Sequence, residues 1–203
     1  MNSYLTRLTP NFNNWRKPSG REGKCGSPEG PLYEGRRGFG WEEWLLNDYY
    51  KPNNQLDGYC YGFIQAFHKM NQAKAKIDRL YLYTKVCDGK SKSNYYLGYI
   101  DNVEVLKHPF TKKSLNDKKL AFCKKAEQDL QQLKITDYQN DLTQMCSEDT
   151  LYNVRFKPND VQIKDFAFQI RPINMARGQA RFKLYDLDRH ANLINELNNY
   201  EKP

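Results

Sequence analysis

The segment from residue 16 to residue 40 constrains the fold of this chain more than any other. It holds seven glycines and three prolines in 25 positions. Glycine weakens helices and strands, and proline lacks the N–H that both need, so a long irregular loop is predicted. Long loops in compact domains are usually functional or disordered. Aromatic residues flank the segment, so we expect it to be anchored at both ends. These residues are Trp15, Phe39, Trp41 and Trp44.

Size and composition indicate one globular domain. The 203 residues match the length of a single domain, expected to span 1–203. Aromatic residues make up 14% of the chain, which supplies enough large apolar surface for a core. A mean hydropathy of -0.91, with no apolar run of about 18 residues, excludes an integral membrane protein. Residues 1–15 show no apolar segment of a signal peptide, so a cytoplasmic location is predicted.

The five cysteines are predicted to be reduced thiols. Their number is odd, and no C-x-x-C pair occurs that would suggest a zinc ribbon. A chain without an export signal is expected to keep its thiols reduced in the cytoplasm. The cysteines are Cys25, Cys60, Cys87, Cys123 and Cys146.

The net charge of +8 is concentrated in two segments. Residues 1–40 contain seven Lys or Arg against three acids, and residues 171–183 contain four basic residues and no acid. The two segments therefore carry the whole positive excess. Arginine predominates in both, and its planar guanidinium suits phosphates and guanine edges. Clustered positive charge attracts nucleic acid, so we expect the two segments to form one DNA-binding surface.

Two sets of residues are the predicted DNA contacts. The basic residues predicted to contact DNA are Arg16, Lys17, Arg21, Lys24, Arg36, Arg37, Arg155, Arg171, Arg177 and Arg181. The aromatic residues predicted to wall a base pocket or to stack on bases are Trp41, Trp44, Tyr59 and Tyr61. Stacking on an aromatic ring contributes about 1–3 kcal/mol per base, and an apolar pocket can sense an added methyl group. The alternative is that the tryptophans anchor the loop, and at least one of Trp41 and Trp44 is expected in the core.

The order of the predicted elements favours an α+β fold. Alternating apolar residues and β propensity predict strands, and apolar positions at helical spacing predict helices. Residues 41–47 fit either a short helix or a strand. Strands do not alternate one for one with helices, so we expect a curved, mostly antiparallel sheet packed by two or three helices. The predicted strands are 59–68, 77–87, 94–106, 151–157, 162–170 and 180–187, with 77–87 and 94–106 forming a hairpin. The predicted helices are 114–133 and 137–147, which form a helical insert over 114–147, and a C-terminal helix within 188–203.

Enzymatic sites find little support in the sequence. The three histidines are far apart, and neither a P-loop nor a zinc-protease motif occurs, so no metal and no cofactor are predicted. Asp101, Glu104 and Lys107 could form a Mg²⁺-dependent nuclease site. The Glu-Val-Leu-Lys spacing is one residue too long to put Glu104 and Lys107 on one face of a strand. A nuclease is therefore the alternative, and a non-catalytic chain is favoured.

Short motifs along the chain resemble the N-terminal region of bacterial HNH-type restriction endonucleases. The motifs are Trp15-Arg16-Lys17-Pro18-Ser19-Gly20-Arg21, Gly38-Phe39-Gly40-Trp41-Glu42-Glu43-Trp44, Asp57-Gly58-Tyr59-x-Tyr61-Gly62-Phe63 and Asn153-Val154-Arg155-Phe156, and the resemblance spans roughly residues 15–187. In such enzymes a reader domain precedes the nuclease and often senses modified DNA. Related readers of the SRA and EVE types have a PUA-like curved β-barrel, so the resemblance implies a small barrel as the alternative to an open sheet.

The resemblance also marks two departures. No HNH nuclease module follows residue 187, and Trp41 stands where such enzymes often have a histidine. Cleavage is therefore not expected of this chain. The prediction is a DNA-binding specificity module of a restriction or phage-defence system, whose partners are double-stranded DNA, including modified DNA, and a nuclease domain or subunit. A PUA-like RNA-binding module is the remaining alternative, distinguished by its preference for unpaired bases.

Overall fold

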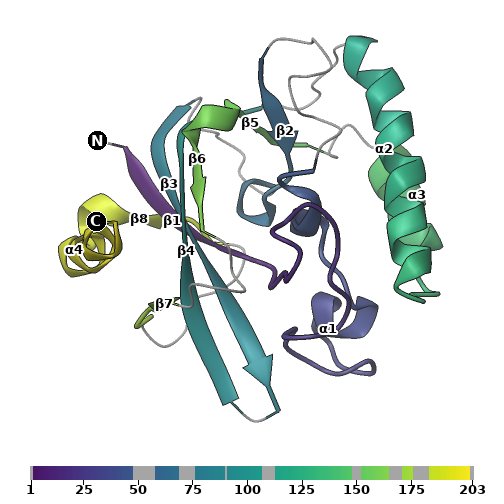
Figure 1. Ribbon diagram of the computed structural model, residues 1–203, viewed down its shortest axis with the longest axis horizontal. Coiled ribbons are helices and arrows are strands. Elements are labelled where there is room, and N and C mark those ends of the chain that lie inside the picture. The colour runs from purple at the N-terminus through teal and green to yellow at the C-terminus, as the bar shows by residue number, and fades with distance from the viewer. Residues whose placement is uncertain are drawn as a thin grey trace.

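The structure, a computed structural model, confirms the predicted α+β fold. It describes residues 2–47, 58–68, 76–89, 91–106, 113–147, 152–164, 171–175 and 183–201. Eight strands in these ranges pair into one mixed, mostly antiparallel sheet, and helices pack beside it (Figure 1). The sheet is open, with β2 and β8 at the ends of the main strand order, rather than closed into a barrel.

The predicted hairpin forms the centre of the sheet. Strands β3 (Lys76–Asp88) and β4 (Ser91–Val105) pair antiparallel along almost their full length. Leu80 and Leu82 pack on one face of the hairpin, and Tyr81 and Tyr83 pack on the other. Because both faces are covered, the alternation places apolar or aromatic side chains on both.

Gly98 lies at an irregularity in the pairing of the two hairpin strands. The register shifts between Leu82 and Tyr83, and Gly98 has a φ of 128°. A Cβ at this position would lie 1.9 Å from the carbonyl oxygen of Gln162 on β6 (Val161–Ile163). Only glycine allows both the positive φ and this close approach of the two strands.

The buried N-terminal strand is the element that the sequence analysis missed. Strand β1 (Ser3–Leu8) pairs parallel with β3 and antiparallel with β8 (Tyr185–Asp186). All six of its residues are buried, including Thr6 and Arg7. The strand was not predicted because its polar residues follow no regular alternation with its apolar ones. A strand covered on both faces does not need such an alternation.

The remaining strands are shorter than predicted. Strand β2 (Cys60–Gly62) pairs with β5 (Val154–Phe156), and β5 pairs with β4. β6 and β7 (Arg171–Pro172) add to β4. The predicted residues 165–170 and 180–182 lie outside the described residues.

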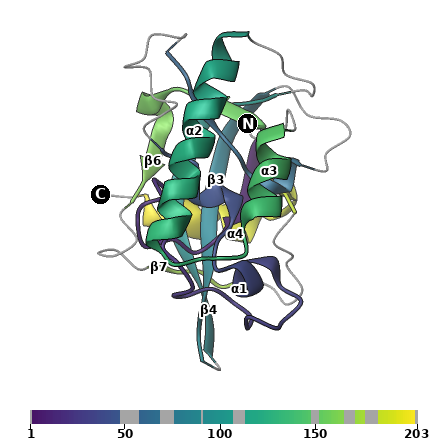
Figure 2. The same cartoon turned by 90° about the vertical axis from the view of Figure 1, so that its right-hand side faces the viewer.

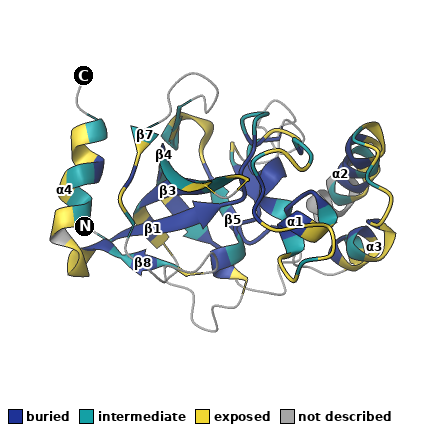
Figure 3. Ribbon diagram, turned by 90° about the horizontal axis from the view of Figure 1, so that it is seen from below, coloured by how far each residue is buried: buried dark blue, intermediate teal, exposed yellow. Residues whose placement is uncertain are grey.

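The helices lie at opposite ends of the molecule. Helices α2 (Lys113–Gln132) and α3 (Gln139–Ser147) pack together on one side, and α4 (Ala191–Tyr200) covers the sheet on the other (Figures 1 and 2). Their outer surfaces are largely exposed (Figure 3). In the described part of the chain, no helix combines the length and apolar character needed to cross a bilayer.

A short helix, α1 (Tyr33–Arg37), corrects the prediction that residues 16–40 contain no regular structure. It ends at Gly38, whose φ of 78° provides the left-handed cap that helices favour. Glu34 forms a buried ion pair of 2.9 Å with Arg7 of β1. Tertiary contacts thus stabilise a helix that is too short to persist by itself.

Two disulfides overturn the prediction of five reduced thiols. Cys25 of the Gly/Pro-rich loop is bonded to Cys87 of β3, and Cys123 of α2 is bonded to Cys146 of α3. Cys60 is a free, buried thiol. The partners are distant in the sequence, so the pairing follows from the fold and could not be deduced from the spacing of the cysteines.

The cysteine pairing predicts a simple thiol count. In denaturant without reductant, one thiol per chain, that of Cys60, should react with a thiol reagent, and five should react after reduction. Peptide mapping of the unreduced protein should recover the 25–87 and 123–146 pairs. Five reactive thiols in freshly purified, unreduced protein would contradict both crosslinks.

Candidate nucleic-acid interface

The first part of the basic loop is folded around Asn11, which is fully buried. Its Oδ1 accepts hydrogen bonds from the backbone N–H groups of Asn13 (2.7 Å) and Trp15 (2.9 Å). Its Nδ2 donates to the carbonyl oxygen of Lys17 (2.7 Å) and to Oε1 of Glu43 (2.8 Å). One side-chain amide thus fixes the path of the chain from residue 13 to residue 17.

Glu43 joins this loop to the 3-10 helix at Trp41–Trp44. Its Oε1 accepts from Asn11, from the backbone N–H of Ser19 (3.0 Å) and from the Lys24 ammonium (3.0 Å), and its Oε2 accepts from the N–H of Gly40 (2.8 Å). The Lys24 and Glu43 side chains are 1% and 0% exposed, so this ion pair is removed from water. Burial raises the pKa of the Glu43 carboxyl, and the Lys24 ammonium and the backbone donors oppose that rise.

Glu42, the neighbour of Glu43, anchors the same helix to two other segments. Its Oε2 accepts from the backbone N–H (2.8 Å) and the hydroxyl (2.9 Å) of Thr9, and its Oε1 accepts from the backbone N–H of Gln65 (2.9 Å). Both carboxylates of this Glu-Glu pair are buried. They therefore hold the loop in place and are not positioned to bind a metal.

Unusual backbone angles direct the basic residues outward. Asn14 and Trp15 have φ values of 53° and 54°, in the left-handed region. Asparagine tolerates this region, whereas tryptophan rarely adopts it. Trp15 is held there by complete burial and by its indole N–H, which donates to the carbonyl of Thr9 (3.0 Å). Arg16 and Lys17, which follow, are exposed. Backbone strain of this kind is concentrated at functional sites.

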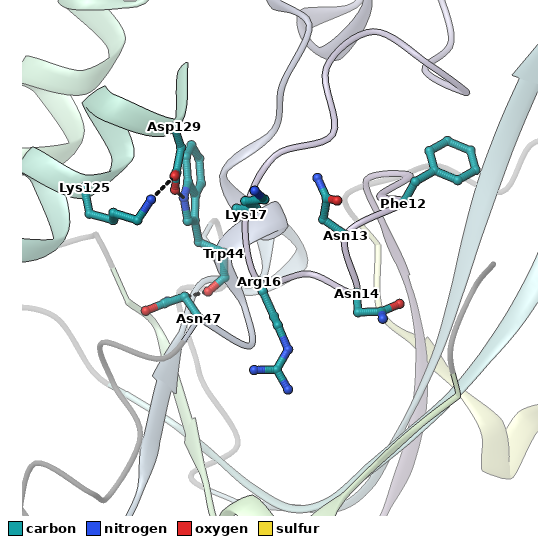
Figure 4. A pocket seen from close by; sticks show the side chains of 9 residues that line it. All are labelled: Phe12, Asn13, Asn14, Arg16, Lys17, Trp44, Asn47, Lys125 and Asp129. Atoms are coloured by element: carbon teal, nitrogen blue, oxygen red, sulfur yellow. Dashed lines mark hydrogen bonds and ion pairs between the residues drawn. The ribbon is translucent and has the colours of Figure 1, made fainter. Parts of the chain in front are cut away.

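Arg16 and Lys17 line a cavity of about 480 Å³ between the loop and α2 (Figure 4). This volume falls within the range of about 300–1,000 Å³ that is usual for small-molecule sites. In Figure 4 a group formed by Trp44, Lys125 and Asp129 lies on one side and Asn14 on the other. The residues that line the cavity are Phe12, Asn13, Asn14, Arg16, Lys17, Trp44, Asn47, Lys125 and Asp129.

Asp129 of α2 forms the acidic part of the cavity wall. It is 3% exposed, accepts a hydrogen bond from the indole N–H of Trp44 (3.1 Å) and pairs with the Lys125 ammonium. Lys125 and Asp129 are four residues apart on one face of the helix. Among the described residues that line the cavity, three side chains are therefore basic and one is a carboxylate.

Three of the predicted DNA contacts are used to hold the loop together. Lys24 is buried against Glu43. The Arg21 guanidinium donates to the carbonyl oxygens of Gly35 and Arg36 at the end of α1. Arg37 connects α1 to α3, through its ion pair with Asp141 (2.8 Å) and its contacts with Asp137. These side chains are bound to protein groups and stabilise the loop; Lys24 is buried, whereas Arg21 is exposed.

Arg155 is also bound within the protein. Its guanidinium donates to Oε2 of Glu104 (2.7 and 2.9 Å) and lies 4.4 Å from the centre of the Tyr59 ring. Arg36, by contrast, is exposed on α1, and its side chain makes no ion pair within the described residues. Of the predicted basic contacts, Arg16 and Lys17 therefore line a cavity, and Arg36 lies on the exposed surface of α1.

The late basic segment does not join the early one in the described part of the chain. Arg171 donates to the carbonyl of Tyr200 and lies over its ring. β7 and α4 occupy one side of the β3–β4 hairpin, and α1 occupies the other (Figures 1 and 3). Arg177 and Arg181 lie outside the described residues. Among the described residues, Arg171 therefore lies apart from the early segment, because the hairpin stands between the two.

All four predicted stacking residues belong to the protein core or its edge. Trp44 and Tyr61 are 3% and 2% exposed, and Trp41 and Tyr59 are half-buried against the same cluster. Trp41, Trp44 and Tyr61 line a second cavity, but its volume of about 10 Å³ is the space of one water. Trp44 alone reaches the large cavity, and its low exposure limits it to a wall. The expectation that at least one of Trp41 and Trp44 is a core residue is confirmed.

The carboxylates of the alternative nuclease site are each paired with an arginine. Asp101 accepts from the Arg79 guanidinium (2.6 and 2.9 Å), and Glu104 accepts from Arg155. Lys107 lies outside the described residues. Within the described residues, no group of three or more acidic, histidine or cysteine side chains could hold a metal ion.

Six of the lining residues were missed from the sequence: Phe12, Asn13, Asn14, Asn47, Lys125 and Asp129. The Lys125–Asp129 spacing is an ordinary helical ion-pair pattern, and it gave no reason to place the pair beside the loop. Only the packing of α2 against the 3-10 helix brings Asp129 to Trp44.

Comparisons of the chain with protein-family models, with curated proteins and with solved structures found no match. The resemblance to restriction-enzyme reader domains therefore stays a prediction.

The Glu43–Lys24 pair predicts a large loss of stability on substitution. Glu43→Gln should lower the free energy of unfolding by about 3–5 kcal/mol. The buried Lys24 ammonium loses its counter-charge, and the Gly40 N–H loses its carboxylate acceptor. Chemical denaturation followed by circular dichroism measures this value.

A matched variant and a double variant test the cause. Glu22→Gln removes the same charge from an exposed position in the loop and should change stability by no more than about 0.5 kcal/mol. Adding Lys24→Met to Glu43→Gln should restore part of the lost stability. Equal effects of Glu43→Gln and Glu22→Gln would refute the role given to this pair.

Proposed function

We propose that the protein is a DNA-binding reader domain and that it contacts DNA through the 12–17 loop and the adjoining cavity. The observation that carries the proposal is the convergence of Arg16, Lys17 and Lys125 on one cavity, where Asp129, paired with Lys125, is the one carboxylate among the described lining residues. Phosphate groups are the ligands that such an excess of cationic donors favours.

The rigidity of the loop supports this assignment. Asn11 and Glu43 fix the loop through seven of the hydrogen bonds given above, so Arg16 and Lys17 are presented from a defined backbone. A pre-organised contact loses less conformational entropy on binding than a mobile one. The arrangement therefore suits recognition of a particular phosphate geometry better than a diffuse basic surface would.

The cavity extends the proposal to a reader of modified DNA. Its size is sufficient for one nucleotide turned out of the helix, and pockets that accept a turned-out base can sense a chemical modification. The sequence resemblance points in the same direction and adds a nuclease domain or subunit as the partner that would cut. In this proposal the chain supplies specificity for a restriction or defence system and performs no cleavage.

A cytoplasmic location is the part of the proposal that the disulfides weigh against. Disulfides are rare in reducing compartments, and the chain has two. A restriction reader meets foreign DNA in the cytoplasm, so the proposal requires binding to persist after both disulfides are reduced. Glu43, Asn11 and Trp15 hold the 12–17 loop without either crosslink, which makes this expectation reasonable.

The proposed contacts predict a salt-dependent loss of DNA binding. The Arg16→Ala/Lys17→Ala variant should bind a duplex at least about tenfold more weakly than the wild type, and the slope of log K against log salt should fall by about two, one for each lost phosphate contact. Fluorescence anisotropy with a labelled duplex at several salt concentrations, with and without reductant, provides both values.

The control variant removes two exposed charges elsewhere. Lys157→Ala/Arg189→Ala changes the net charge equally, and neither residue lines the cavity, so binding should stay within about twofold of the wild type. Equal losses in the two variants would mean that net charge alone drives binding. Wild-type binding that is insensitive to salt would contradict the proposal, and equal affinity for methylated, hydroxymethylated and unmodified duplexes would remove the modified-DNA part.

A further inference from the structure

The wall of the cavity beside α2 has a defined pattern of hydrogen-bonding groups. Lys125 is a donor, and it lies in direct contact with the carboxylate of Asp129, an acceptor. An ammonium group has three donor hydrogens and a carboxylate has about four acceptor positions. In the described structure the carboxylate accepts from Lys125 and Trp44, and the ammonium donates to Asp129. Both groups therefore have unused hydrogen-bonding positions, and the Lys125 side chain, 35% exposed, is more accessible than that of Asp129, 2% exposed.

A carboxylate beside the cationic groups of the cavity restricts the ligands that the cavity favours. Three cationic groups would suffice for a phosphate alone, and a carboxylate repels phosphate. Asp129 is almost fully buried and points to the same cavity, so it favours a ligand that is anionic at one end and rich in N–H donors at the other. A nucleotide with a suitable base has both ends.

Guanine matches the pattern best among the four DNA bases. Its pairing edge presents the O6 acceptor and next to it the N1–H and N2–H donors, in the order that a Lys-Asp pair requires. Thymine places a second carbonyl against the carboxylate. Cytosine and adenine each present an amino donor followed by a ring acceptor, so they satisfy the pair only in part. Side-chain pairs of this type discriminate between bases by about tenfold or more.

We propose that the cavity takes a guanine nucleotide turned out of DNA, with Lys125 donating to O6, Asp129 accepting from N1–H and N2–H, and Arg16 and Lys17 binding the phosphates. The inference rests on the proposed function and names the base that the same site selects. Trp44 is a positioning residue, because its indole N–H holds the carboxylate (3.1 Å) and leaves little ring face for stacking.

The test uses duplexes that differ only in one unpaired base opposite an abasic site, since such a base is easily turned out. Guanine should bind the wild-type protein at least about tenfold more tightly than thymine. Hypoxanthine lacks the 2-amino group and should bind several-fold more weakly than guanine. This arm needs no variant, so it stays decisive if a substitution disturbs folding.

Variants on α2 assign the preference to Asp129. Asp129→Asn should reduce the guanine-to-thymine ratio to within about twofold. Glu127→Gln removes the same charge from the same helix outside the cavity, so it should keep the wild-type ratio. Lys125→Met should lower the ratio as well, because it removes the donor to O6.

The outcomes separate the two proposals. Two results would overturn the base assignment and leave the DNA reader intact. The first is salt-sensitive DNA binding without a preference for guanine, and the second is a preference for guanine that survives Asp129→Asn. No binding to any duplex at low salt would overturn the DNA reader itself. Free dGMP and dTMP as competitors test whether an isolated nucleotide also enters, and equal displacement by the two would count against guanine.

Discussion

The buried carboxylate of Glu43 is the interaction on which the candidate site depends. It binds Asn11, Ser19, Lys24 and Gly40, which lie in different parts of the Gly/Pro-rich region and its approach. A segment so rich in glycine has a high conformational entropy to lose, and few apolar side chains to offset it. The Glu43 carboxylate accepts from several backbone and side-chain donors at once and so stabilises the folded loop. Its ion pair with Lys24 makes the arrangement specific.

The rest of the architecture follows from anchoring this loop to a sheet and a helical pair. The Cys25–Cys87 disulfide and the bond from the Cys87 N–H to the Gly23 carbonyl (2.9 Å) attach the loop to β3. Arg37 attaches α1 to α3, which the Cys123–Cys146 disulfide attaches to α2. The cavity lies where these parts meet, so a small change in the packing of α2 would alter both its volume and the position of Asp129.

Basic residues in this protein serve two different purposes. Lys24, Arg21 and Arg37 donate to carbonyl and carboxylate oxygens and stabilise the loop, whereas Arg16 and Lys17 line the cavity. A net charge of +8 therefore overstates the cationic surface that is available to a ligand. The same applies to the aromatic residues, since Tyr61 is buried in the helical core and Trp44 reaches the cavity only as part of its wall.

Local pattern determined the hairpin 77–106, the helices near 114–133 and 188–199 and the α+β class, because alternation and helical spacing act over a few residues. The clustering of charge at residues 16–37 also marked the loop whose Arg16 and Lys17 line the cavity. Tertiary structure alone decided the burial of β1, the two disulfides and the meeting of Asp129 with Trp44. It also decided that Arg171 lies away from the early basic segment. These features depend on which distant residues become neighbours, and the pairing of a charge or a thiol is a property of its neighbours and not of its position in the chain.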